Sequence, residues 1–243
     1  MKKLFAVLLA MCLMIPAFGA MAETLTMGTN AAFAPYEYYE GETIVGIDAE
    51  IAAAIAEKLG MDLDIVDMDF DAIIPAVATG KVMIGMAGMT VTPERLQNVN
   101  FSNTYSIGIQ SIIVPAESPI ASVDDLAKPE FIIGVQKGTT GHLYCEGDYG
   151  TDRVKAFKNG PEAVEALKNG SVDCVVIDNE PAKRLVEANE GLKILDTAYT
   201  EEEYAIALAL ENTELLEKIN KALDELLDDG TLQAIVDKYI TGE

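Results

Sequence analysis

One pattern occurs twice in this chain, first as Ala78-Thr79-Gly80-Lys81-Val82-Met83-Ile84-Gly85-Met86 and again as Leu167-Lys168-Asn169-Gly170-Ser171-Val172-Asp173-Cys174-Val175. In both stretches a helix end is followed by a glycine, a polar residue, a valine and an apolar strand. Polar residues follow each strand, Thr90 after the first and Asp178 after the second. Two α/β units of similar design produce such a repeat, and each directs the carboxyl end of a strand toward a shared crevice. The repeat predicts a two-lobe α/β fold with a ligand cleft between the lobes. A chance similarity of two short helix-turn-strand units is the alternative.

Strands and helices alternate on both sides of the repeat, as in βαβ units. Apolar or alternating runs predict strands at residues 25–29, 44–47, 62–66, 82–86, 107–114, 131–135 and 172–177. Capping and periodicity signals predict helices at residues 48–59, 71–79, 139–145 and 161–168, and two amphipathic helices within residues 213–239. Asp48 is the expected N-cap of the helix that Gly60 ends.

The chain is strongly acidic. It carries 40 Asp and Glu residues against 17 Lys and Arg residues, a formal charge of −23 at pH 7. Such a charge repels phosphate backbones, so a nucleic acid is not an expected partner. Of the 243 residues, 50% are hydrophobic, which is enough for a packed core. The composition therefore favours one or two folded domains over a disordered chain.

Residues 1–22 have the features of a secretory signal peptide. Lys2 and Lys3 form a positively charged start, residues 4–15 are apolar, and Ala20-Met21-Ala22 offers small residues to a signal peptidase. The apolar run is shorter than the roughly 20 residues that span a bilayer, which argues against a membrane anchor. We expect cleavage after Ala22 and export to the periplasm.

Cleavage would remove Lys2 and Lys3 but no acidic residue, which leaves 15 basic and 40 acidic residues and a net charge of −25. No later segment holds 18 uninterrupted apolar residues, so no membrane anchor is expected in the mature chain. Cys12 raises the alternative of a lipoprotein, but Met11 stands where a lipoprotein signal has a small residue. The prediction is a free exported protein.

Two cysteines remain in the mature chain, Cys145 and Cys174. Export to an oxidising compartment permits a disulfide between them, and two buried thiols are the alternative. The sequence is compatible with a disulfide and with two free thiols. The two thiols and His142, which is the single histidine, do not stand at zinc-ligand spacing. No metal and no cofactor are expected.

The segment after the first repeated strand has groups that bind a carboxylate. Thr90-Val91-Thr92-Pro93-Glu94-Arg95 supplies hydroxyls, a helix start and one guanidinium. Arginine can hold a carboxylate with two parallel hydrogen bonds, which lysine cannot do. Arg95 is therefore a candidate carboxylate ligand, and an ordinary surface ion pair with Glu94 is the alternative.

A second anion site is predicted at Gln136-Lys137-Gly138-Thr139-Thr140-Gly141, which follows a strand and opens a helix. Backbone N–H groups at such a helix start bind anions, and glycine lets a ligand approach the backbone. The segment is neither a P-loop nor a dinucleotide fingerprint, so a carboxylate-sized anion is the prediction. A plain tight turn with a threonine cap is the alternative.

Asp178 ends the second repeated strand, which is apolar apart from Asp173. Burial destabilises a carboxylate unless a cation compensates it, so Asp178 predicts a bound ammonium. Its alternative role is N-cap of the following helix, and the two roles are compatible. Phe33 and Phe70 lie among polar loop residues and are candidates to clamp a ligand side chain, with core packing as the alternative.

A carboxylate site, an ammonium site and an aromatic clamp together describe an α-amino acid. The chain resembles the extracellular solute-binding proteins, family 3, of polar amino acid ABC uptake systems, over essentially the whole mature length. Its Gly46-Ile47-Asp48-Ala49-Glu50-Ile51 is similar to the family's G-F-D-x-D-L signature, with Ile in place of Phe. Further motifs in family order are Phe33-Ala34-Pro35-Tyr36, Thr92-Pro93-Glu94-Arg95, Phe101-Ser102, Lys137-Gly138-Thr139-Thr140 and Asp178-Asn179-Glu180-Pro181.

The resemblance implies a type II periplasmic binding protein fold and a role for each matched residue. Arg95 would bind the α-carboxylate of the ligand, together with Thr90 and the backbone of Thr140. Asp178 would bind the α-ammonium, together with the carbonyl of Gly88.

Phe33 and Phe70 would contact the side chain of the ligand. Asn30 and Gln136 stand where relatives carry residues that distinguish ligand side chains, and both are neutral amides here, which favours a neutral polar side chain over a cationic one. The complete set of expected ligand-binding residues is Asn30, Phe33, Phe70, Gly88, Thr90, Arg95, Gln136, Thr139, Thr140 and Asp178.

The resemblance also implies two crossings of the chain between the lobes, near residues 108–112 and 203–206. Lobe 1 would hold residues 23–110 and 205–243, and lobe 2 would hold residues 111–204. Lobe 1 is then discontinuous, and the C-terminal helices return to it.

The implied function is the capture of a free polar L-amino acid by hinge closure, as the substrate-binding component of an ABC importer. The closed protein would dock on membrane permease subunits, and we expect a monomer. The sequence holds no Ser-His-Asp, Cys-His or metal set, so no catalytic residue is assigned. Two alternatives stay open. One is an enzyme similar to cyclohexadienyl or arogenate dehydratases on the same fold, and the other is a ligand sensor that docks on a receptor.

Overall fold

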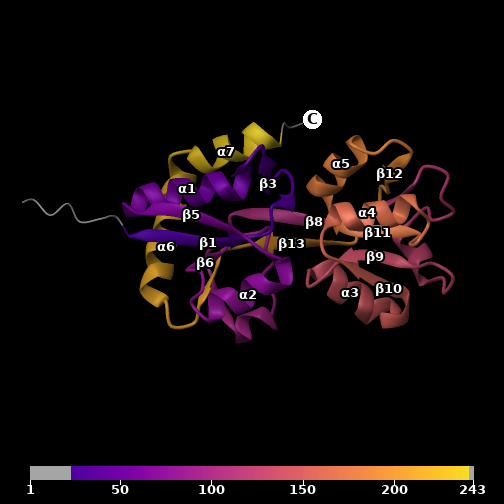
Figure 1. Ribbon diagram of the computed structural model, residues 1–243, viewed down its shortest axis with the longest axis horizontal. Coiled ribbons are helices and arrows are strands. Elements are labelled where there is room, and N and C mark those ends of the chain that lie inside the picture. The colour runs from indigo at the N-terminus through magenta and orange to yellow at the C-terminus, as the bar shows by residue number, and fades with distance from the viewer. Residues whose placement is uncertain (1–22, 241–243) are drawn as a thin grey trace, which may run out of the picture.

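The computed structural model describes residues 23–240. The predicted signal peptide and its cleavage after Ala22 therefore concern residues outside the described range. Two sheets with helices packed on them form two lobes that lie next to each other along the longest axis of the molecule (Figure 1). Within the described range, no helix combines the length and the apolar character that crossing a membrane requires.

Lobe 1 is built on a five-stranded sheet. Its strands in spatial order are β5 (Asp62–Asp67), β1 (Thr24–Thr29), β6 (Ile84–Gly85), β14 (Ala207–Ala209) and β7 (Val99–Phe101). Its helices are α1 (Ile47–Leu59), α2 (Phe70–Ala78), η1 (Arg95–Gln97, a 3₁₀ turn), α6 (Thr213–Asp228) and α7 (Thr231–Tyr239). A small antiparallel sheet of β2 (Ala32–Phe33), β3 (Glu37–Glu40) and β4 (Thr43–Val45) leads into α1. Helix α1 packs against both C-terminal helices, as Figure 1 shows.

Lobe 2 is built on a six-stranded sheet. Its strands in spatial order are β10 (Val154–Phe157), β9 (Ile133–Gln136), β11 (Cys174–Asp178), β8 (Ser106–Pro115) and β12 (Leu192–Ile194), with β13 (Thr200–Tyr204) also paired to β8. Its helices are α3 (Thr140–Tyr149), α4 (Gly160–Lys168) and α5 (Asn179–Glu187), with 3₁₀ turns η2 (Val123–Ala127) and η3 (Thr151–Arg153).

The chain passes between the two sheets twice within residues 23–240, once into β8 and once out of β13. These two strands are antiparallel neighbours, with Gln110 opposite Thr200 and Ser106 opposite Tyr204. Figure 1 shows both strands running between the lobes. A Cβ on Gly108 would lie 2.3 Å from the Tyr204 hydroxyl oxygen, so this glycine lets the tyrosine pack directly on the hinge strand. The predicted lobe limits fall within β8 and immediately after β13.

The two repeated stretches have the same local structure, which confirms the two-lobe α/β prediction. Gly80 and Gly170 follow the ends of α2 and α4 with φ of +71° and +75°. In each turn, the two N–H groups after the glycine donate to one helix carbonyl, that of Ala76 in the first turn and that of Ala166 in the second. The strands that follow, β6 and β11, each have one parallel and one antiparallel neighbour.

Asp48 is not the N-cap of α1, and that prediction is wrong. The helix begins at Ile47, with Gly46 as a cap that makes no side-chain bond. The N–H groups of Ile47 and Asp48 donate to the carbonyls of Pro35 and Tyr36, at 3.0 and 2.9 Å. A preceding loop thus satisfies the helix N-terminus, and no side-chain cap is needed. The Asp48 side chain is buried inside lobe 1 instead.

Four predicted strands are shorter than expected. Those at 131–135 and 172–177 begin later than predicted, at Ile133 and Cys174, and each ends one residue beyond its predicted end. Of residues 82–86, only Ile84 and Gly85 pair as β6, and the strand expected at 44–47 ends at Val45 because α1 begins at Ile47.

Cys145 and Cys174 are free and buried in the structure, so the alternative of two buried thiols is the one observed. Both side chains belong to the core of lobe 2, where they pack with Ile133, Val135 and Val176. Burial raises the pKa of the Cys145 thiol to about 12 and raises the pKa of Cys174 as well. The two residues act as small apolar side chains in this core.

We expect Gly46→Ala to destabilise the fold more than Gly60→Ala at the other end of α1. A Cβ on Gly46 would lie 2.2 Å from the Tyr36 carbonyl oxygen, and φ is +127°, so strain of about 1 to 3 kcal/mol is expected. Gly60 has φ +67° but no atom within 4 Å of an added Cβ, so its cost is about 1 kcal/mol. Urea unfolding measures both variants, and equal losses of stability would contradict the steric argument.

Candidate functional site

One cavity between the lobes is lined by all the residues that the sequence predicts for the site. The open volume inside it is small, about 10 Å³, so the two walls lie close together. Lobe 1 supplies Asn30, Phe33, Phe70, Gly88, Thr90 and Arg95, and lobe 2 supplies Gln136, Thr139, Thr140 and Asp178. Glu37 and Ala87 complete the lining. Strands β6 and β11 both end toward the cleft, and this common direction brings residues from the two halves of the repeat together.

Arg95 lies at the start of η1 and is only 9% exposed. Its Nη1 donates to the Thr90 carbonyl at 2.6 Å, and its Nη2 donates across the cleft to the Gly138 carbonyl at 3.2 Å. The guanidinium carbon lies 5.4 Å from the centre of the Phe70 ring, within cation–π range. Burial lowers the pKa of Arg95, and the Glu202 carboxylate opposes this change. The guanidinium is therefore held in the cavity wall by carbonyls rather than by a surface ion pair.

Asp178 ends β11 on the opposite lobe and is 6% exposed. Its carboxylate accepts hydrogen bonds from Gln110 Nε2, at 2.8 Å, and from the Tyr204 hydroxyl. It stands at the N-cap position of α5, as the alternative in the sequence analysis has it, but makes no side-chain capping bond there. Burial raises the pKa of Asp178 to about 7, with a further contribution from the Glu202 carboxylate. A cation in the cavity would stabilise the ionised form.

Glu202 joins the lobes through hydrogen bonds. This residue of β13 is 5% exposed, and its Oε2 accepts from Thr90 Oγ1 and from Gln110 Nε2, each at 3.0 Å. Because Gln110 also donates to Asp178, one chain of hydrogen bonds runs from Thr90 in lobe 1 through the hinge strands to Asp178 in lobe 2. Residues on both walls of the cavity are therefore hydrogen-bonded to the strands that connect the lobes.

The start of α3 forms part of the lobe 2 wall. Thr139 is the N-cap, and its Oγ1 accepts from the His142 N–H at 3.3 Å. Gly138 has φ +80°, and a Cβ there would lie 2.8 Å from the Asp71 Cβ of lobe 1, so only glycine fits this approach of the two lobes. Thr139 and Thr140 both line the cavity. The threonine cap is therefore observed, and the anion site at this helix N-terminus stays a prediction.

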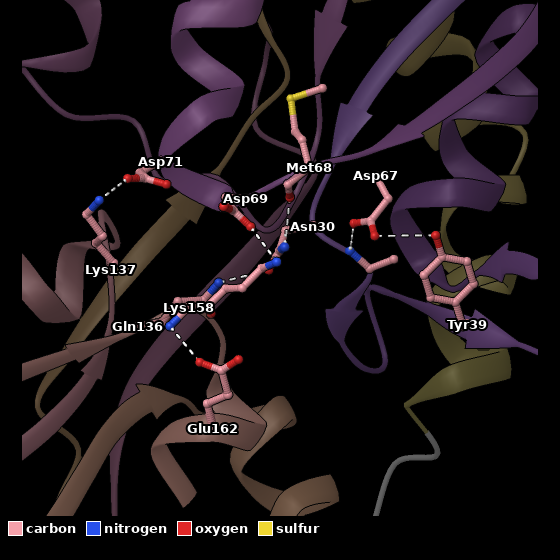
Figure 2. Close-up of polar contacts among 11 residues, drawn as sticks. Asn30, Tyr39, Asp67, Met68, Asp69, Asp71, Gln136, Lys137, Lys158 and Glu162 are labelled. Atoms are coloured by element: carbon pink, nitrogen blue, oxygen red, sulfur yellow. Dashed lines mark hydrogen bonds and ion pairs between the residues drawn. The ribbon is translucent and has the colours of Figure 1, made fainter. Parts of the chain in front are cut away.

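Asn30 and Gln136 meet across the cleft, as Figure 2 shows. Gln136 Nε2 donates to Asn30 Oδ1 at 2.9 Å, and Asn30 Nδ2 donates to the Met68 carbonyl at 2.8 Å. Phe33 and Phe70 are each 7% exposed, belong to hydrophobic core clusters and also line the cavity. Both roles that the sequence allows for the two rings, core packing and contact with the cavity, are therefore compatible with the structure.

Two ion pairs join the lobes at the rim of the cleft (Figure 2). Lys137 Nζ lies 2.8 Å from Asp71 Oδ2, and Lys158 Nζ lies 3.0 Å from Asp69 Oδ1. The lysine side chains are 62% and 59% exposed, and none of these four residues lines the cavity. Because each pair links one lobe to the other, both pairs form only when the lobes are in contact. We call these four residues the rim pairs.

The geometry agrees with a known family. The model of the bacterial extracellular solute-binding proteins, family 3, matches residues 25–242. This chain belongs to that family. The arginine-binding extracellular protein ArtP of Bacillus subtilis (strain 168) is 34% identical to this family 3 protein over 224 residues, which cover 90% of this chain and 87% of the relative.

Two solved structures are similar to this family 3 protein over most of its length. An ancestral arginine-binding protein bound to glutamine has a TM-score of 0.86 and 41% identity, covering 91% of this chain and 100% of that chain. An ancestral amino acid-binding protein, described as a precursor of cyclohexadienyl dehydratase, has a TM-score of 0.83 and 32% identity, covering 89% of this chain and 94% of that chain. These relatives are named as binding proteins and not as enzymes, as expected for this family 3 protein.

Ala87 and Glu202 are parts of the site that the sequence analysis does not assign, and Glu37, which the sequence offers as a cleft acid beside Asp178, has no binding role assigned there. Glu37 directly follows the motif at 33–36, and its place next to that motif is a usable signal. Glu202 is the middle one of three consecutive glutamates, and only the alternation of β13, with Glu202 and Tyr204 buried, singles it out. No sequence signal identifies Ala87.

Other charged clusters in the described range lack the features of this cavity. A more open groove between α1 and α6 contains none of the predicted site residues, and its Lys58 and Lys218 pair with Glu225 and Glu214. Among residues 23–240, no group of three or more His, Cys, Asp and Glu side chains is arranged to hold a metal ion.

We expect Asp178→Asn to change how folding stability depends on pH. The folded protein binds the Asp178 proton more tightly than the unfolded chain, because the folded pKa is about 7 and the unfolded pKa is about 4. Raising the pH from about 4 to about 8 therefore destabilises the folded wild type through this group. The unfolding free energy of the variant minus that of wild type should rise over this range by at least about 1 kcal/mol.

Urea unfolding at several pH values measures this difference, with Asp152→Asn as a control at an exposed aspartate of lobe 2. A difference that stays constant with pH for Asp178→Asn would contradict the raised pKa.

Proposed function

We propose that this protein binds a free L-amino acid with a polar side chain in the cleft and delivers it to the permease of an ABC importer. The observation that carries the proposal is one cavity lined by the Arg95 guanidinium of lobe 1 and the Asp178 carboxylate of lobe 2. An α-amino acid has a carboxylate and an ammonium on the same carbon atom, so its two charges can pair with these two groups.

The carboxylate of the ligand would bind Arg95 and the N-terminus of α3. Arg95 Nη2 now donates to the Gly138 carbonyl at 3.2 Å, a longer bond than its Nη1 makes to Thr90. A carboxylate is a stronger acceptor than a carbonyl, and it can take two parallel bonds from a guanidinium. Binding would therefore replace a weak contact across the cleft with a charged one that uses both lobes.

The side chain of the ligand would extend toward Asn30 and Gln136, with Phe33 and Phe70 beside it. The two amides now satisfy each other at 2.9 Å, and an amide has both donors and an acceptor to offer a polar group. Neither amide carries a charge, which supports a neutral polar side chain. The ancestral relative that is named for arginine and holds glutamine supports a polar ligand as well.

Closure about β8 and β13 would complete the site. The ligand carboxylate docks on Arg95 in lobe 1, and Asp178 then closes over the ammonium, so that the ligand stabilises the closed state by contacts that the open state lacks. The hydrogen bonds across the cleft in this structure, Arg95 to Gly138 and Gln136 to Asn30, show that the two walls can approach to bonding distance.

Location and partners are part of the same proposal. We propose that the chain is exported through a signal peptide at residues 1–22, is cleaved after Ala22 and resides in the periplasm. We also propose that it is a monomer and docks on a permease. The sequence pattern and the family match support these proposals. The lobe limits are proposed as 23–110 with 205–243, and 111–204. A sensor that docks on a receptor would use the same cavity, and binding without any effect on uptake would favour that alternative.

A thermal-shift screen of the mature protein, refolded to remove bound ligand, tests the binding class. The panel is the twenty amino acids and prephenate. A ligand present at 100 times its Kd stabilises the folded state by about 2.7 kcal/mol, which raises the melting temperature clearly. A rise with one or a few amino acids supports the proposal, and a rise with prephenate alone, followed by its turnover, would support the enzyme alternative.

With the amino acid found in that screen, Arg95→Ala should weaken binding by two or more orders of magnitude, because it leaves the ligand carboxylate buried without a cation. Arg95→Lys should recover only part of the loss, because lysine cannot make two parallel bonds. Lys155→Ala is the control for the loss of a positive charge, since this exposed lysine bonds to the Ser171 carbonyl of its own lobe and lies outside the cavity. Calorimetry measures each Kd, and an unchanged Kd for Arg95→Ala would rule out the assignment.

The double variant Lys137→Ala and Lys158→Ala should weaken ligand binding about two- to fivefold at low ionic strength, because it removes both rim pairs from the closed state. The difference from wild type should shrink as salt is added, since salt screens exposed pairs. Lys128→Ala with Lys168→Ala is the matched control, because these lysines pair with acids of their own lobe. Equal effects of the two double variants would contradict a role of the rim pairs in closure.

A further inference from the structure

Two buried carboxyl groups, Glu37 in the lining of the cavity and Asp48 behind it, take no part in the ligand contacts proposed above. Glu37 begins β3 and Asp48 is the second residue of α1, and both are 0% exposed. Asp48 Oδ2 accepts from the Gly88 N–H at 2.8 Å and from the Tyr105 hydroxyl at 2.9 Å. Asp48 Oδ1 and both carboxyl oxygens of Glu37 receive no hydrogen bond from any described N–H or O–H group.

The backbone brings the two groups together, since the Asp48 N–H donates at 2.9 Å to the carbonyl of Tyr36, the residue before Glu37, and each carboxyl group acts on the pKa of the other. Two ionised carboxylates buried side by side repel each other, so such a pair keeps one proton. A proton on Glu37 turns one unpaired oxygen into a donor and satisfies Asp48 Oδ1. It leaves Asp48 as an anion that accepts three hydrogen bonds.

The surroundings favour this assignment of the proton. The other charged groups that act on Glu37 are Asp178 and Asp67, which are also acids, and the phenols around Asp48 include Tyr105. Burial raises the pKa of Glu37 well above its usual range, and Asp48 adds to the rise. Burial also raises the pKa of Asp48, but only to about 6, because hydrogen bonds from Gly88, Tyr105 and Glu37 stabilise its anion. The proton therefore resides on Glu37.

The pair is linked to the cavity through Gly88. This residue follows β6 with φ +54°, and a Cβ there would lie 2.7 Å from Phe33 Cε1, so the backbone passes close against the aromatic wall. Its N–H is fixed by Asp48, and its carbonyl is the proposed second acceptor for the ligand ammonium. The orientation of this short segment of backbone thus depends on where the Asp48 carboxylate sits.

We propose that Glu37 is a positioning residue: as a neutral carboxylic acid it donates a hydrogen bond to Asp48, and through Asp48 it fixes Gly88 in the conformation that accepts the ligand ammonium. This inference rests on the proposed function, because Gly88 accepts an ammonium only if the ligand is an amino acid. Loss of the proton places two carboxylates side by side, displaces Asp48 from Gly88 and weakens ligand binding.

Two substitutions separate the donor from the volume of the side chain. Glu37→Gln keeps a donor for Asp48 Oδ1, and its Kd at pH 7 should stay within about threefold of wild type. Glu37→Leu keeps most of the volume but leaves Asp48 Oδ1 without a donor, and its Kd should rise at least about tenfold. Equal Kd values for the two variants would overturn the proposal.

Infrared spectroscopy of the ligand-free protein detects the proton directly. The spectrum of wild type minus that of Glu37→Gln should contain the carbonyl band of a protonated carboxylic acid at pH 7. This readout needs neither ligand binding nor the Glu37→Leu variant, so it holds even if that variant does not fold. Absence of the band at pH 7 would overturn the proposal. If wild type shows the band but binds no amino acid, the proposed function fails and the proton assignment stands.

The pH profile connects the proton to binding. The ratio of the wild-type Kd to the Glu37→Gln Kd, measured from about pH 6 to pH 9, cancels the titration of the ligand ammonium itself. The ratio should rise at the pH where the infrared band disappears and should stay constant wherever the band persists. A ratio that changes while the band persists, or a band that disappears while the ratio stays constant, would contradict the link between Glu37 and Gly88.

Discussion

The antiparallel pairing of β8 with β13 is the constraint on which the rest of this structure depends. Both passages of the chain between the lobes run through these two strands, so any relative movement of the lobes must bend this ribbon. The ribbon also carries Gln110 and Glu202, whose side chains bond to Asp178 on one side and to Thr90 on the other. Hinge and binding cavity are therefore one hydrogen-bonded unit, in which a change in lobe geometry alters the positions of the groups that meet the ligand.

The cavity and its walls contain more buried carboxyl groups than buried cations. Arg95 is its buried cation, whereas Asp178 lines it, Glu37 and Asp48 lie against it, and Glu202 bonds to its wall. An excess of buried carboxylates is unfavourable in a ligand-free protein, and the raised pKa of Asp178 and of Glu37 expresses that cost. An ammonium group between the lobes would relieve it at Asp178, while the proton shared by Glu37 and Asp48 relieves it farther inside lobe 1. The same excess disfavours anionic ligands that lack an ammonium.

Sequence patterns predicted much of this arrangement because helix ends, turns and strands depend mainly on residues that are close together in the chain. The glycine-ended helix before each central strand leads to Asp178 at the end of β11 and to Thr90 in the segment after β6, and the Gly80 and Gly170 turns have the same hydrogen bonds, as the repeat requires. Asp48 shows where local reasoning fails. An acid before an apolar helix usually caps it, but here the carbonyls of Pro35 and Tyr36 occupy the helix N-terminus, so the carboxylate turns inward. The shortened β6 has a similar origin, since pairing partners and not apolarity decide where a strand ends.

The sequence by itself determined the two-lobe α/β class, the motifs that supply Arg95, Asp178 and the start of α3, and the chemical class of groups that face the cleft. Only the tertiary structure decided which groups meet: Glu202 with Thr90, Gln136 with Asn30, and Glu37 with Asp48. The reason is physical. Helix ends, turns and strand periodicity arise from interactions over a few residues, whereas each of these pairs depends on how separately formed elements pack, and no short pattern in the chain encodes that packing.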